Sequence, residues 1–234
     1  MSGFDVMAIL ANPEFVRMLV RGIQMTIIVF VGSWMLAMSL ASVLLAVRML
    51  PSRVAEACVA AYISYHRNVP TLVQLMFWYF GIASLLPTEA QIWLSDYNSE
   101  AVFAVIALGL CQAAYFSEDL RSGLRAVPKG QWEASRALGH SYVGAMRWVL
   151  MPQAVGNAGP AIINHTVSLF KNSSLAMAIG VAELTHVVKE IESRTFRAFE
   201  AYLLGTLIYL ACTLLLMAIG AWLERRNRHM RASS

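Results

Sequence analysis

Residues 201–223 read AYLLGTLIYLACTLLLMAIGAWL, a run of 23 residues without a charged side chain. A helix that crosses the hydrocarbon core of a bilayer needs about 20 apolar residues, so this stretch predicts a transmembrane helix. The whole chain has the same character: 58% of its 234 residues are hydrophobic, 14% are charged, and the mean hydropathy is +0.58. A soluble domain carries about 25% charged residues. The composition therefore predicts an all-α, polytopic membrane protein.

Four further segments have the length or the apolar character of a membrane span. With the first, they predict five spans in a single transmembrane domain over residues 1–234, at about 22–47, 54–88, 101–119, 155–184 and 201–223. The fourth is the most polar, because it contains Lys171. A charged side chain at that depth has to face protein or water, since lipid does not solvate it.

The basic residues predict the orientation in the membrane. Most of the 18 Lys and Arg residues fall in cytoplasmic segments if the N-terminus is outside and the C-terminus is inside. The first 16 residues contain no Lys or Arg, so we expect no cleavable signal peptide. The basic residues form no patch with aromatic side chains, which makes nucleic acid a poor candidate partner and leaves membrane lipid as the expected surroundings.

The loop at 121–153 is the longest expected cytoplasmic segment between spans. Good helix formers fill 131–138, Gly139 then looks like a stop signal, and helical apolar spacing resumes until Pro152. We expect two short helices, the second ended by Pro152. Such an element is either an interfacial helix that rests on lipid or a projection that fits a groove on a cytoplasmic partner.

This loop resembles the EAA loop of ABC-importer permeases, whose form is Glu-Ala-Ala-x3-Gly-x9-Ile-x-Leu-Pro. Here it reads Glu133-Ala134-Ser135-x3-Gly139-x9-Val149-x-Met151-Pro152. Further segments resemble the polar amino acid permeases of this family: HRNVPTLVQ at 66–74, AYFSEDLRSG at 114–123, KNSSL at 171–175 and EL at 183–184. The segment at 66–74 is most similar to the glutamate/aspartate branch of these permeases. Ser122 stands where the family has a glycine, so the sequence does not support a turn that depends on that glycine.

The resemblance implies the type I ABC-importer permease fold and a bacterial inner-membrane location. It implies these partners: a homologous permease, as a heterodimer rather than a homodimer; two copies of a cytoplasmic ATP-binding subunit; and a periplasmic solute-binding protein. The residues that it implies for ATPase coupling are Glu133, Ala134, Ser135, Gly139 and Pro152.

The chain itself is not expected to be an enzyme. The glycine pair Gly139-x4-Gly144 has the spacing of a phosphate-binding loop, but Ala145 and Met146 stand where Lys and Ser or Thr are needed. The cysteines and histidines show no metal-ligand spacing, and we expect neither a metal nor a cofactor. ATP hydrolysis is therefore expected in a separate subunit and has to be transmitted mechanically.

An amino acid in transit is a zwitterion and needs polar groups at membrane depth. The expected path residues lie on the fourth span: Asn164, His165, Ser168, Lys171 and Asn172. Spacings of 4 and 3 put Asn164, Ser168 and Lys171 on one helical face. Alternatively, Lys171 reaches an interface or pairs with Glu118, and His165 is a hydrogen-bonded packing residue. We expect Arg67 to be an interface anchor or ion-pair partner rather than a ligand.

Two other functions remain open at this level. A self-sufficient secondary transporter or channel is the main alternative, although such proteins commonly show an internal repeat and five spans divide poorly into one. A non-transporting membrane scaffold for a soluble partner is the third possibility, but it would not require the polar fourth span.

Overall fold

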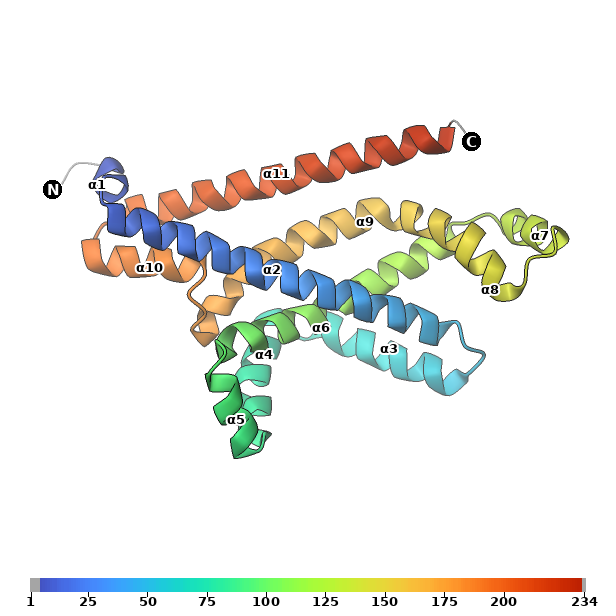
Figure 1. Ribbon diagram of the computed structural model, residues 1–234, viewed down its shortest axis with the longest axis horizontal. Helices are drawn as coiled ribbons and strands as arrows, with labels where there is room; N and C mark the ends of the chain where they lie inside the picture. Colours follow the sequence, from blue (N-terminus) through green and yellow to red (C-terminus); the bar gives the residue numbers. More distant parts are fainter. Residues whose placement is uncertain (1–4, 233–234) are drawn as a thin grey trace.

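The protein is helical throughout the part that the computed structural model describes, residues 5–232, and no strand occurs there (Figure 1). This confirms the predicted all-α class. The elements are α1 (Met7–Leu10), α2 (Pro13–Arg48), α3 (Arg53–Asn68), α4 (Thr71–Met76), η1 (Phe77–Ile82), η2 (Ala83–Leu85), α5 (Thr88–Ser95), α6 (Ser99–Arg125), α7 (Lys129–Ala137), α8 (Tyr142–Ala145), η3 (Met146–Leu150), α9 (Met151–Asn172), η4 (Ser173–Ile179), α10 (Leu184–Thr195) and α11 (Ala198–Ala232).

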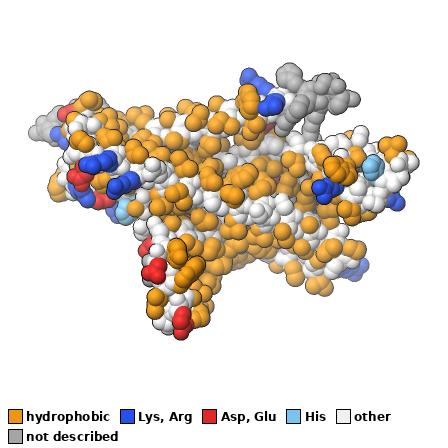
Figure 2. Space-filling view, viewed as in Figure 1, with side chains coloured by type: hydrophobic (Ala, Val, Ile, Leu, Met, Phe, Trp, Pro, Cys, Tyr) orange, Lys and Arg blue, Asp and Glu red, His pale blue; other side chains and the backbone are white. Residues whose placement is uncertain are grey.

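Three helices are long and apolar enough to cross a membrane, Pro13–Arg48, Ser99–Arg125 and Ala198–Arg226. The first and third expose most of their apolar side chains, as expected of helices that face lipid. Figure 2 shows charged side chains gathered toward the two ends of the long helices, with a mainly apolar zone between. The five predicted spans overlap α2, α3 to η2, α6, α9 with η4, and α11, and their limits remain predictions.

Helix α6 is the most buried of the long helices and packs between α2 and α9. Two glycines allow this close packing. A Cβ added at Gly109 would lie 2.7 Å from Leu36 Cδ2, and one at Gly123 would lie 2.3 Å from the backbone oxygen of Ala154. Gly123 is buried inside α6, and the close approach of α9 depends on this glycine. Ser122 is exposed, and the helix continues through it without a turn.

The second predicted span is not one helix, because the chain breaks at Pro70 between α3 and α4. Proline lacks the N–H that would continue the helical hydrogen bonds. The buried Gln74 side chain fills this gap: its Nε2 donates to the backbone oxygens of His66 (3.0 Å) and Val69 (2.7 Å). Its Oε1 lies 2.5 Å from Nδ1 of His66, which therefore donates, since an amide oxygen only accepts.

The expectation that Pro152 ends the second loop helix is wrong. Residues 142–172 form one continuous helix, in which α8 passes through the π-helical segment η3 into α9. Met151 N–H bonds to the oxygen of Met146, five residues back. This wider turn makes room for the Pro152 ring, which would clash with the preceding turn of a regular α-helix.

Candidate coupling element and translocation path

Residues 129–150, which we term the coupling element, lie at the end of the molecule where α6 and α11 finish (Figure 1). Helix α7 begins after Pro128 and ends at Ala137. His140 N–H donates to the oxygen of Ser135 and Gly139 N–H to that of Arg136, the two bonds of a Schellman end. Gly139 has φ +87, a left-handed value that favours glycine, which confirms the predicted stop.

The coupling element exposes apolar side chains at its tip. Leu138 is 81% exposed and Val143 69%, and Tyr142 and Trp148 are exposed beside them. Of the predicted coupling residues, Glu133, Ala134, Gly139 and Pro152 are exposed as well. Side chains of this kind at a solvent-facing turn are typical of a protein-binding surface.

The other face of the coupling element is fixed to the body of the protein. The rings of Trp132 and Tyr142 lie 5.3 Å apart and edge-on, and Trp132 packs on the cluster formed by Val127, Leu150 and Ala154. Ser135 is buried, and its hydroxyl has no hydrogen-bond partner among the described residues. The family alanine would fill this place without an unsatisfied hydroxyl.

The predicted path residues occupy one side of α9. With 100° of rotation per residue, the five lie within a sector of about 120°. We term this the polar sector: Asn164, His165, Ser168, Lys171 and Asn172. None of its members is buried, whereas Phe170 on the opposite side is. Ser168 Oγ donates to the oxygen of Asn164, one turn before it.

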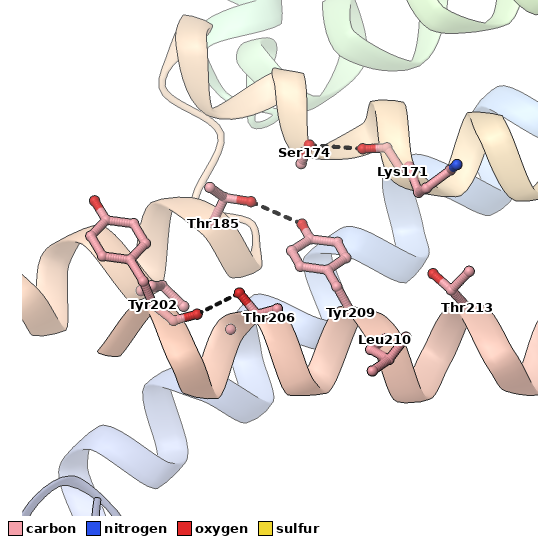
Figure 3. A pocket seen from close by; sticks show the side chains of 10 residues that line it. Lys171, Ser174, Thr185, Tyr202, Thr206, Tyr209, Leu210 and Thr213 are labelled. Atoms are coloured by element: carbon pink, nitrogen blue, oxygen red, sulfur yellow. Dashed lines mark hydrogen bonds between the residues drawn. The ribbon is translucent and has the colours of Figure 1, made fainter. Parts of the chain in front are cut away.

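One edge of the polar sector opens into a pocket of about 490 Å³ between α9, η4, α10 and α11 (Figure 3). Lys171 and Ser174 line it on one side, and hydroxyl-bearing side chains line it on the other, namely Thr185, Tyr202, Thr206, Tyr209 and Thr213. Glu183, wholly buried behind the pocket, accepts from Tyr209 Oη at 2.7 Å and from the first N–H groups of α10.

The other edge of the polar sector meets α6. His165 Nδ1 lies 2.6 Å from Oδ2 of Asp119, and the His165 ring is 5.0 Å from that of Tyr115. Arg67, on the last turn of α3, stands over the Tyr115 ring at 5.5 Å. Asp119 is 9% exposed and was not among the predicted site residues. Spacing along the chain gave no signal for it, because its partner His165 lies on another helix.

The predicted alternative in which Lys171 pairs with Glu118 is wrong. Glu118 forms ion pairs with Arg48 and with Arg121, the latter at 3.7 Å, so its carboxylate is already compensated. Within the described part of the chain, no acidic side chain pairs with Lys171 or with Arg67. Of the two roles expected for Arg67, the ion pair is therefore not found among the described residues, where its guanidinium lies over the Tyr115 ring, and the interface anchor stays a prediction.

The structure thus combines long outer helices with exposed apolar side chains, an exposed turn at one end and one polar helix face. The sequence pattern of the binding-protein-dependent transport system inner membrane components matches residues 38–229. The chain belongs to this family and is thus a multi-pass protein of the inner membrane and a transporter component rather than an enzyme.

Several known proteins are similar over most of their length. The arginine transport system permease protein ArtQ of Bacillus subtilis (strain 168) is 37% identical over 70% of this chain and 72% of its own. The glutamate/aspartate import permease protein GltJ of Escherichia coli (strain K12) is 28% identical over 93% of this chain and 90% of its own.

The fold is found in solved structures as well. A chain from the crystal structure of an amino acid ABC transporter with histidines has a TM-score of 0.83 and 29% identity, covering 95% of this chain and 99% of that one. A chain of the MetNI methionine ABC transporter in an inward-facing conformation has a TM-score of 0.67 at 19% identity, over 92% and 98% of the two chains, which shows a shared fold.

Proposed function

We propose that this chain is the permease subunit of an ATP-driven ABC importer for polar amino acids. The family supports an importer, and the relatives named for arginine and for glutamate/aspartate support amino acids as the transported class. In this function the chain forms half of the translocation path, together with a homologous permease. A periplasmic solute-binding protein delivers the amino acid, and two cytoplasmic ATP-binding subunits hydrolyse ATP.

The uncompensated Lys171 carries this proposal. Lys171 shares its pocket with Thr213, which lies 15 residues after Ala198 and 13 before Arg226, near the middle of the apolar stretch of α11. A charge at mid-membrane costs about 2.5–3.5 kcal/mol even on the insertion scale. A cation without an acidic partner at this depth is expected to face an aqueous path, where water and a passing carboxylate solvate it.

The coupling element supplies the link to ATP hydrolysis. Its exposed tip, with Leu138 and Val143, is apolar enough to bury in a groove on an ATP-binding subunit. Glu133 makes charge-assisted contacts there, and Ala134 keeps that surface thin. The left-handed φ of Gly139 allows the turn. The position where a Cβ would stand faces open space, so the partner subunit can approach the Gly139 backbone closely.

The remaining features of the proposal follow the charge distribution and the relatives. The N-terminus lies outside and the C-terminus inside, because the basic segments, including the coupling element, are then cytoplasmic. A heterodimer with a second permease is favoured over a homodimer. Glutamate or aspartate is favoured as the amino acid, since the chain aligns with the glutamate/aspartate permease GltJ over 221 residues.

Reconstitution in proteoliposomes tests the proposal. The chain, a companion permease, the ATP-binding subunit and the solute-binding protein are reconstituted together, and uptake of labelled amino acids is followed. Uptake should require both ATP and the ATP-binding subunit. Uptake by this chain alone, driven by a sodium or proton gradient, would show a secondary transporter and refute the proposal.

Two variants test the coupling. Glu133→Arg and Gly139→Arg should each abolish uptake while ATP hydrolysis and membrane insertion persist, because they alter the docked surface and leave the transmembrane helices intact. Arg125→Gln, an exposed change at the end of α6, serves as the control that leaves uptake unchanged. Normal uptake by both arginine variants would remove the coupling role.

A further inference from the structure

A buried carboxylate stands behind one wall of the pocket that Figure 3 shows. Glu183 is 0% exposed, and it accepts from the backbone N–H groups of Thr185 and His186, each at 2.9 Å, and from Tyr209 Oη at 2.7 Å. All three partners donate, and the start of helix α10 favours a negative charge, which is the environment of an ionised carboxylate. Glu183 forms no ion pair with any residue that the structure describes, so hydrogen bonds alone hold its charge.

This carboxylate fixes the direction of a chain of hydroxyl hydrogen bonds. A carboxylate only accepts, so Tyr209 gives its one hydroxyl hydrogen to Glu183. The Thr185 hydroxyl lies 3.0 Å from Tyr209 Oη and is therefore the donor of the bond that Figure 3 draws between them. Both hydroxyl hydrogens are used within the protein, and both oxygens keep lone pairs for a ligand in the pocket. Successive hydrogen bonds toward an anion polarise one another, which makes these oxygens stronger acceptors.

Two further hydroxyl groups of the pocket are committed in the same sense. Ser174 Oγ donates to the backbone oxygen of Lys171, and Thr206 Oγ1 donates to that of Tyr202. The side chain of Lys171 lines the same pocket and offers the opposite character, a positive charge that only donates. The pocket therefore combines a wall of accepting oxygens, backed by a negative charge, with a cation that has no acidic partner among the described residues.

We propose that Tyr209 and Thr185 are specificity-determining residues that accept hydrogen bonds from the ammonium group of the transported amino acid, and that Glu183 is the positioning residue that orients them. This inference rests on the proposed function. An ammonium group carries three donors and a positive charge, which matches oxygens that only accept. The carboxylate of the same molecule then meets Lys171 within the pocket of about 490 Å³. Every α-amino acid carries both groups, so the assignment holds whatever its side chain.

Direct binding to the purified transporter without its solute-binding protein tests this inference, because that protein would otherwise select the ligand first. The complex of this chain, its companion permease and the ATP-binding subunits is titrated with labelled glutamate and arginine up to the millimolar range. Each is compared with the analogue in which hydrogen replaces the ammonium group, which is glutarate for glutamate and the corresponding guanidino acid for arginine. Whichever amino acid binds should bind about tenfold more tightly than its deaminated analogue, the effect of one charge-assisted hydrogen bond.

Variants assign this preference to the three residues. Tyr209→Phe and Thr185→Val each remove an accepting oxygen and should each weaken amino acid binding about tenfold, while binding of the deaminated analogue stays nearly unchanged. Glu183→Gln keeps the shape of the side chain, but its amide can donate to Tyr209 and leave the hydroxyl hydrogen to point into the pocket, so it should cause the same selective loss. Tyr97→Phe and Glu192→Gln make the same changes outside the pocket lining and should alter neither ligand.

The inference is overturned if the wild-type complex binds the deaminated analogues as tightly as the amino acids, binds none of the four ligands, or keeps its preference in the variants. Equal weakening of both ligands would show a purely structural role and overturn it as well. Should Glu183→Gln fail to assemble, Tyr209→Phe and Thr185→Val decide. ATP-dependent uptake on a preparation without the preference would sink this assignment and leave the importer standing, whereas absence of ATP-dependent uptake of any amino acid would sink the proposed function itself.

Discussion

The imidazole of His165 on α9 and the carboxylate of Asp119 on α6 lie 2.6 Å apart. The aspartate is almost buried, whereas about a third of the His165 side chain is exposed at the edge of the polar sector. Asp119 therefore joins the central helix of the fold to the helix that carries the expected path. His165 is a hydrogen-bonded packing residue and at the same time a member of the polar sector, so the two interpretations from the sequence are compatible.

The Asp119–His165 contact should stabilise the fold as a pair. We expect a double-mutant cycle with Asp119→Ala and His165→Ala to give a coupling energy of about 1–2 kcal/mol, since each residue loses its partner when the other is removed. Thermal or denaturant unfolding of the purified complex measures it. Strictly additive losses would mean that the two side chains do not interact.

Gly123 should tolerate no side chain. A Cβ at this position would lie 2.3 Å from the oxygen of Ala154 and 2.9 Å from the Cβ of Ala158, so Gly123→Ala has to push α6 and α9 apart. We expect a loss of about 1–3 kcal/mol in unfolding free energy. Gly130→Ala is the control: it meets nothing within 4 Å and replaces a glycine in helix α7, so it should stabilise by about 0.5–1 kcal/mol.

Gln74 should be required for the helix break at Pro70. Gln74→Leu removes the donor that serves the oxygens of His66 and Val69 and the acceptor that faces Nδ1 of the buried His66. We expect a loss of about 2–3 kcal/mol, measured as a lower melting temperature of the complex. Gln91→Leu removes a similar side-chain bond, to the oxygen of Leu86, at an exposed position and should cost far less. Equal losses would contradict this role.

Leu138 should contribute to partner binding and hardly at all to stability. It is 81% exposed, so Leu138→Ala removes little packing within this chain. If the coupling element docks in a groove, the same change should weaken association with the ATP-binding subunit about tenfold, as measured by pull-down or surface binding. Leu85→Ala, at a residue 79% exposed on η2 far along the chain, is the matched control and should leave association unchanged.

The sequence predicted local features well where backbone chemistry decides them. Gly139 was expected to end a helix, and its φ of +87 and the two closing hydrogen bonds confirm this. The helical spacing of Asn164, Ser168 and Lys171 was likewise readable, since α9 is helical through all three. Pro152 was misjudged because a proline after a π-helical turn continues a helix, and nothing in the local sequence reveals that wider turn.

Contacts between distant helices could not be predicted in this way. That Glu118 is compensated by Arg48, and that Asp119 reaches His165, depends on how α6 packs against α2 and α9. The same packing explains why Lys171 has no acidic partner among the described residues: Glu118 lies on another helix and pairs with Arg48 and Arg121. Spacing along the chain sets which face of a helix a residue occupies, and only the packing decides its partner.

The unbroken helix from Tyr142 to Asn172 has a mechanical consequence. Its 31 residues measure about 46 Å along the helix at 1.5 Å per residue, from the exposed tip of the coupling element to the turn that holds Lys171. No loop interrupts this length, and the places where it can bend are the π-helical segment η3 and Pro160, so a displacement at Tyr142 passes toward Lys171 through hydrogen-bonded backbone. The exposed turn of the coupling element and the one cation of the polar sector are in this way joined by one continuous helical backbone.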